Sequence, residues 1–385
     1  MASERQATPT GSLSELEIPA ELSRSRLRAR LLIAAGVIVA VIVVVTLLPG
    51  LGGLRARLAH AKPAWVLLGV GMKLLSGVGY VAAFRMIFCR RMSWRVSYQI
   101  GASELAADAL LPTGGAGGLA LGVWALRRGG MPPREIARRT VAFFLLTSVP
   151  NVLGVILIGF GLAVGILGGE HNLLLTAAPA LVAASAIVVV LVVGRVAKSS
   201  GLRRQQSAEP AEASRSRGVA RVHKLVAALG EGVEEAVLLL REGNVILILG
   251  LLAYLAFDVA ILWAAFRALG SAPPVAIVAL AYLIGELGGL IPVPGGLGGI
   301  DAGLVGTLVL YHVPLAPAAG AVLAYRAIAL WVPTIVGGAT FALLRRTLRD
   351  EAELLAVCAP HTEMNIIGMG RVVVAPADDV SQAGS

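Results

Sequence analysis

Charged residues make up only 15% of this 385-residue sequence and aromatic residues only 5%, whereas apolar residues reach 57%. A soluble domain of ordinary composition carries about 25% charged residues. The shortage of charge, together with a mean hydropathy of +0.82, excludes such a domain and predicts an all-α integral membrane protein. The aliphatic content also excludes disorder as the main state, because disordered chains are poor in aliphatic residues.

Cysteine and histidine are equally scarce. The two cysteines lie far apart in the sequence, which excludes a disulfide scaffold. The five histidines are scattered and show no ligand spacing, so no metal site is predicted. Because the sequence also has no P-loop, no G-x-S-x-G and no H-E-x-x-H, we expect neither a cofactor nor an enzymatic activity. The net charge of +10 is attributed to membrane topology and anionic lipid rather than to nucleic acid.

Hydropathy predicts six membrane-spanning helices in a domain that covers residues 31–344. Polar tails at 1–30 and 345–385 flank this domain, and a hydrophilic loop occupies 195–243. The apolar spacing in the second half of the loop predicts an amphipathic helix on the membrane surface. The predicted spans are 31–48, 64–88, 140–167, 173–194, 244–266 and 316–344.

Two further apolar segments, 96–126 and 273–311, are each interrupted by proline and a glycine cluster. Their flanks and spacings agree, which identifies an internal repeat. The first copy covers about 64–167 and the second about 244–344. The glycines Gly114, Gly115, Gly117 and Gly118 align with Gly295, Gly296, Gly298 and Gly299.

Each interrupted segment is predicted to be a re-entrant helical hairpin that returns to its side of entry. Three crossings then separate the hairpins, and an odd number inverts the second copy relative to the first. The charge distribution favours this topology with both termini in the cytoplasm of a plasma-membrane protein. Almost all of the 33 Lys and Arg fall on predicted inner segments, and the predicted outer loops hold only Arg55, Arg57, Lys62 and Arg267.

The glycine turns allow two interpretations that the sequence leaves open. Broken helices of inverted repeats form the substrate site of many transporters, and backbone N–H groups at helix starts favour anions such as a lipid phosphate. Alternatively, the glycines only allow close helix packing, because Gly114, Gly118 and Gly122 form a ridge at a spacing of four residues, as do Gly295, Gly299 and Gly303.

Ionisable residues within apolar segments are costly and usually face an interior or a cavity. We expect Arg326 to have a carboxylate or a lipid phosphate as its partner. Asp301 or Glu286 is the expected carboxylate, with Asp258 as the alternative for a purely structural pair. Lys73 is expected to extend its ammonium group to the membrane surface. The residues expected to line a substrate path are Glu104, Glu286, Asp301 and Arg326.

The segment P-V-P-G-G-L-G-G-I-D-A-G at 292–303 resembles the lysylphosphatidylglycerol synthase transmembrane region, a flippase-like family. The segment L-P-T-G-G-A-G-G at 111–118 is similar to its actinobacterial members, and the likeness extends over about 30–345. The resemblance implies lipid translocation. Members usually have Glu where this chain has Asp301. The tail of about 40 residues after the domain leaves no room for a fused aminoacyl-transfer domain, so synthesis of an aminoacylated lipid is not expected.

The sequence thus predicts a protein that flips a phospholipid or aminoacylated phospholipid between leaflets. Two alternatives stay open: a carrier of polyprenyl-phosphate or polyprenyl-linked glycans, and a membrane enzyme that acts on lipid. The expected partners are membrane phospholipid, a cytoplasmic lipid-modifying enzyme or glycosyltransferase, and a second copy of the chain. No nucleic-acid partner is expected.

Overall fold

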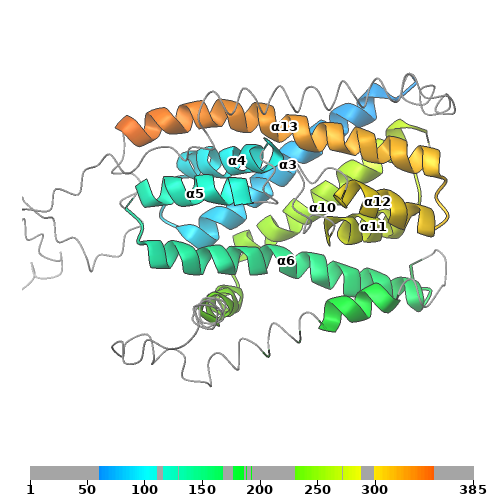
Figure 1. Ribbon diagram of the computed structural model, residues 1–385, viewed down its shortest axis with the longest axis horizontal. Helices are drawn as coiled ribbons and strands as arrows, with labels where there is room; N and C mark the ends of the chain where they lie inside the picture. The colour runs from blue at the N-terminus through cyan, green and yellow to red at the C-terminus, as the bar shows by residue number, and fades with distance from the viewer. Residues whose placement is uncertain are drawn as a thin grey trace, which may run out of the picture.

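Four long helices dominate the computed structural model (Figure 1), which describes residues 60–110, 116–128, 130–167, 177–185, 188, 192, 230–270, 272–287 and 299–350. The described part of the chain is helical and contains no strand. All four helices are long and apolar enough to cross a membrane. They are α3 (Pro63–Phe88), α6 (Pro133–Ala163), α10 (Val245–Ala268) and α13 (Leu315–Asp350).

These helices confirm the all-α membrane architecture and four of the six predicted spans. The predicted span 31–48 lies outside the described residues, and so does half of 173–194. Local sequence sets the helix starts. Pro133 begins α6, where a missing N–H costs nothing, and the Asn244 side chain caps α10 by accepting the N–H groups of Ile246 and Leu247 at 3.0 and 3.2 Å.

Each glycine-interrupted segment forms a pair of short helices. The first pair is α4 (Trp94–Leu110) and α5 (Ala116–Arg128), and the second is α11 (Val275–Leu287) and α12 (Gly299–Leu310). The two pairs lie toward opposite ends of the long helices (Figure 1), as expected for an inverted repeat. Their entry into a membrane as re-entrant hairpins stays a prediction.

Helices α3 and α10 run side by side and antiparallel between the two pairs (Figure 1), and their backbones come close at Gly79 and Gly250. A Cβ atom at Gly79 would lie 2.7 Å from the Gly250 carbonyl oxygen, and one at Gly250 would lie 2.9 Å from that of Gly79. Only glycine permits this approach of two backbones. Two apolar cores lie along these helices, one around Phe84 and Phe143 toward one end and the other around Leu262 and Leu280 toward the other end.

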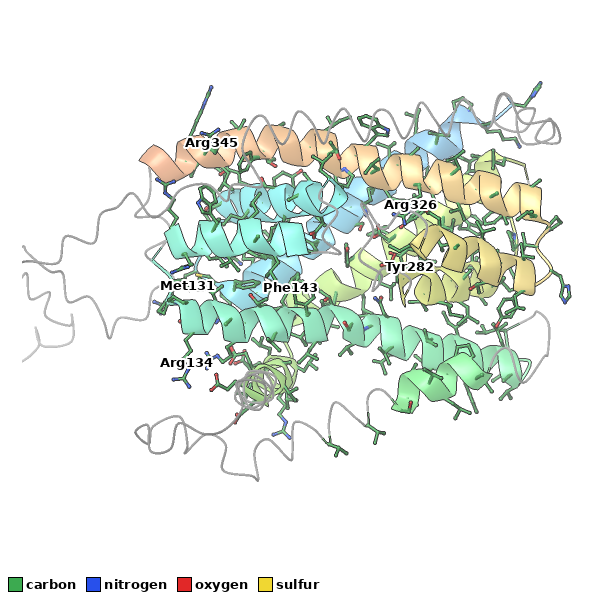
Figure 2. All side chains as sticks on the ribbon, viewed as in Figure 1. Met131, Arg134, Phe143, Tyr282, Arg326 and Arg345 are labelled. Atoms are coloured by element: carbon green, nitrogen blue, oxygen red, sulfur yellow. The ribbon has the colours of Figure 1, made fainter. Side chains whose placement is uncertain are left out.

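The described basic residues gather at one end of the molecule, where α3 and α13 end and α6 and α10 begin. Figure 2 shows Arg134 and Arg345 at this end. At the opposite end, the Lys62 N–H donates to the Ala268 carbonyl at 3.0 Å. We call the first end the basic end. Its arginines include Arg85, Arg90, Arg91, Arg95, Arg127, Arg128, Arg134, Arg138, Arg139, Arg241, Arg345 and Arg346.

Residues 230–241 form a helix at the basic end, within the region where an amphipathic helix was predicted. This helix packs on the protein: Ala236 and Leu239 are buried in the core around Phe84, while Leu238 and Leu240 remain exposed. Ion pairs add to the contact, namely Glu231–Arg134 at 2.9 Å, Glu235–Arg138 at 3.5 Å, and Glu242–Arg90. The sequence pattern located the helix but not its contact with α6.

Candidate functional site

Glu104 lies in the interior of the first helix pair, with only 4% of its surface exposed. The hydroxyl group of Tyr80, on α3, donates a hydrogen bond to the Glu104 carboxylate at 3.1 Å. A buried carboxylate requires such a donor, because transfer of a charge out of water is costly. The contact holds α4 against α3 at mid-length of the molecule.

The glycine ridge of α5 packs against α4 and leaves room for two carboxylates of that helix. A Cβ atom at Gly122 would lie 1.5 Å from Oε1 of Glu104, and one at Gly118 would lie 2.5 Å from Oδ2 of Asp108. Any larger residue at Gly118 or Gly122 would therefore displace an acidic side chain. The first ridge therefore packs against α4 and also lies next to two carboxylates.

The side chain of Asp108, a residue of α4, caps the start of α5. Its Oδ1 accepts the backbone N–H of Gly118 at 2.7 Å. One of the two interpretations of the glycine turns assigned the N–H groups at this helix start to a lipid phosphate, but at Gly118 the N–H group donates to a carboxylate of the chain itself. The contact shows that the helix start accepts an oxyanion. A substrate-binding role for Gly118 stays a prediction.

In the second helix pair, Asp301 of α12 forms an ion pair with Arg326 of α13 at 2.5 Å. One of the two expected carboxylates is therefore confirmed as the Arg326 partner. The pair is partly accessible, with 19% of the Arg326 side chain and 26% of the Asp301 side chain exposed. Glu286, near the end of α11, is half-buried. Figure 2 shows Arg326 and Tyr282 on the helices around this pair.

Glycines of the second ridge serve packing. A Cβ atom at Gly303 would lie 3.1 Å from the Gly285 Cα atom, and one at Gly285 would meet Leu304 at 2.7 Å. The backbones of α11 and α12 therefore approach closely at this point. Gly299 is the first residue of α12.

A second buried ion pair joins α3 to α10. Lys73 Nζ lies 2.8 Å from Oδ1 and 3.1 Å from Oδ2 of Asp258, and the two residues are 7% and 3% exposed. The Tyr282 hydroxyl donates to Asp258 at 3.4 Å. The prediction that Lys73 reaches the membrane surface is wrong, because pairing with a carboxylate removes the cost of an isolated buried ammonium. Asp258 is likewise not the Arg326 partner.

The sequence model described as "Lysylphosphatidylglycerol synthase TM region" matches residues 32–337, which is most of the chain. The chain belongs to this family. The resemblance drawn from the two glycine motifs is thereby confirmed. A comparison with curated proteins finds no match. The family and the apolar helices together identify a multi-pass membrane protein of a lipid-related family.

Within this member of the family, the structure brings together parts of the predicted site. Glu104 meets Gly122, and Asp301 meets Arg326. Gly117 lies buried at the start of α5. Five predicted glycines lie outside the described residues: Gly114, Gly115, Gly295, Gly296 and Gly298.

Three residues were not predicted to take part in polar contacts. Tyr80 donates to Glu104, Tyr282 donates to Asp258, and Lys73 pairs with Asp258. A signal existed for Lys73: it and Asp258 are opposite charges inside two predicted spans. No signal distinguished the two tyrosines from aromatic core residues.

Proposed function

We propose that this protein translocates a phospholipid or aminoacylated phospholipid between membrane leaflets as a carrier, without covalent chemistry. In this proposal the helix pairs α4–α5 and α11–α12 are re-entrant hairpins that open alternately to the two sides. The basic end lies on the cytoplasmic side of the plasma membrane, because Lys and Arg are enriched on that side of membrane proteins. Both termini then lie in the cytoplasm.

One observation carries the proposal: the two helix pairs lie at opposite ends, and each places an anion contact near the middle of the molecule. In the first pair the Gly118 N–H holds the Asp108 carboxylate at 2.7 Å. In the second pair Arg326 holds the Asp301 carboxylate at 2.5 Å. A lipid phosphate presents the same kind of oxygen, so it can replace either carboxylate.

The substrate exchange follows from these contacts. As the phosphodiester reaches α5, it takes the Gly118 N–H and releases Asp108. On the other side, the phosphate pairs with Arg326, whose guanidinium can bind two phosphate oxygens at once. Asp301 holds Arg326 in place when no lipid is bound. Glu104 and Glu286 line the path between the contacts, where their carboxylates suit a cationic headgroup.

An Asp108→Asn variant tests this exchange. Asparagine keeps an oxygen that can cap α5 but loses the negative charge, so the lipid phosphate faces a weaker competitor at Gly118. We expect the purified variant to carry more anionic phospholipid than the wild type, measured by quantitative mass spectrometry of co-purified lipids. A fall in bound anionic lipid would contradict the exchange.

Headgroup competition separates the proposed substrate from the alternatives. In vesicles that contain the protein, excess phospholipid should slow translocation of a fluorescent phospholipid more strongly than excess polyprenyl phosphate. The reverse order would favour the polyprenyl carrier. Conversion of phospholipid to a new product by the protein in detergent, where no leaflets exist, would favour the lipid enzyme.

A further inference from the structure

A groove runs along the outside of the first helix pair, from the basic end toward the middle of the molecule. The residues that line it belong to α3, α4 and α13, which lie next to one another in Figure 1. Two adjoining cavities, which share Tyr98, make up this groove. We call it the α4 groove.

The mouth of the α4 groove combines polar and aromatic side chains. Its cavity has a volume of about 470 Å³ and is lined by Trp94, Arg95, Tyr98, Gln99 and Thr340 among others. Trp94 and Arg95 are exposed. Tryptophan and tyrosine prefer the depth of lipid headgroups, and arginine is suited to phosphate. The mouth therefore has the composition of a headgroup contact at the membrane surface.

Gln99 is the residue that marks this mouth as a binding site. Only 4% of its surface is exposed, and its Oε1 has no hydrogen-bond partner in the part of the chain that the structure describes. A buried polar atom without a partner is energetically costly, so such atoms normally have one. Because Gln99 lines the mouth cavity, a ligand in that cavity can supply the missing donor.

The inner part of the α4 groove is apolar. Its cavity, of about 30 Å³, lies between Leu74 and Gly77 of α3, Leu105 of α4, and Val336 of α13. The absence of a side chain at Gly77 leaves this space open, since a Cβ atom there would meet only Leu105 Cδ1 at 3.8 Å. An extended hydrocarbon chain that starts at the mouth can follow this surface inward.

We propose that the α4 groove binds an anionic glycerophospholipid whose headgroup carries a hydroxyl group. The phosphate pairs with Arg95, a headgroup hydroxyl donates to Oε1 of Gln99, and one acyl chain lies along Leu74 and Gly77. Built on the proposed function, this site is the loading position for lipid in the leaflet at the basic end. It is separate from the anion contacts at Gly118 and Arg326.

The test uses the full-length protein in nanodiscs of phosphatidylcholine that contain a phosphatidylglycerol probe with a photoreactive diazirine in one acyl chain. After irradiation, mass spectrometry maps the adducts. We expect adducts on the groove faces of α4 and α13, and stronger competition by unlabelled phosphatidylglycerol, which carries hydroxyl groups, than by phosphatidylcholine, which carries no donor. Adducts confined to other helices, or equal competition by both lipids, would overturn the proposal.

Two matched pairs of variants sharpen the test. Gly77→Leu fills the inner groove and should abolish the adducts, whereas Gly338→Leu adds the same side chain at an exposed position with nothing within 4 Å and should preserve them. Arg95→Gln should reduce labelling, whereas Arg127→Gln removes an exposed arginine from the same end without an effect. Unchanged labelling in both Gly77→Leu and Arg95→Gln would contradict the site.

Translocation in vesicles, measured in parallel, separates this inference from the proposed function. Groove adducts without translocation would preserve the binding site and reject the carrier function. Translocation without groove adducts would preserve the function and reject the site.

Discussion

Lys73 of α3 and Asp258 of α10 form an ion pair of 2.8 Å that is almost completely buried, although 185 residues separate them in the sequence. The pair lies between the antiparallel helices α3 and α10, and Asp258 also receives the Tyr282 hydroxyl of α11. It therefore joins the helices that carry the two repeats.

Removal of one partner of this pair should destabilise the fold strongly. Lys73→Met leaves the Asp258 carboxylate buried without its cation, which costs about 3–5 kcal/mol. The double variant Lys73→Met/Asp258→Leu removes both charges and should recover most of the loss. Thermal unfolding of the purified proteins in detergent gives the comparison. A single variant as stable as the wild type would show that the pair has no structural role.

The contact between Glu104 and Gly122 predicts a sharp steric effect. In Gly122→Ala the new methyl group would overlap the Glu104 carboxylate and force α4 and α5 apart. Gly306→Ala is the matched control on α12, because a Cβ atom there meets nothing within 4 Å. We expect reduced thermal stability and translocation for Gly122→Ala alone, with partial recovery in Gly122→Ala/Glu104→Ala. Equal behaviour of the two alanine variants would refute the contact.

Arg326 is expected to act on the substrate as well as on Asp301. Arg326→Lys keeps the charge but loses the planar guanidinium, so it should retain part of the translocation rate. Arg326→Gln should lose both translocation and co-purified anionic lipid while the protein remains monodisperse. Normal transport by the Gln variant would exclude a substrate role. A Gln variant that fails to fold, but folds when Asp301→Asn is added, would identify a structural pair only.

The proposed orientation predicts opposite labelling at the two ends. With a membrane-impermeant maleimide on intact cells, Lys62→Cys should be labelled and Arg127→Cys should be protected. Both positions are exposed in the structure, and the unmodified chain gives the background. Labelling only after the cells are opened confirms that the cysteine at position 127 is present. The opposite pattern would invert the orientation.

The sequence predicted those features that depend on long apolar runs and on repetition. Spans of eighteen or more apolar residues identified the long helices, and the duplicated Pro–Gly pattern identified both short helix pairs. Arg326 was assigned to a carboxylate of the adjacent helix pair because its mid-span position prevents escape to water.

Most contacts between distant segments were not predicted from the sequence. Lys73 was interpreted alone, because the presence of opposite charges in two predicted spans does not show that Lys73 and Asp258 face each other. The same holds for Asp108 of α4, which caps α5, and for Glu231, whose partner Arg134 is 97 residues away in the sequence. Helical periodicity gives the face of a helix, but not the element that covers this face.

Translocation itself is tested most directly in vesicles that contain a fluorescent phospholipid in both leaflets. A membrane-impermeant reductant bleaches only the outer leaflet unless the protein exchanges lipid across the bilayer. The account predicts nearly complete bleaching with the wild-type protein and bleaching of only about half the signal with a monodisperse Arg326→Gln variant, the fraction expected from outer-leaflet access alone. Bleaching that stops at the outer leaflet in vesicles containing the wild-type protein would contradict the proposed function.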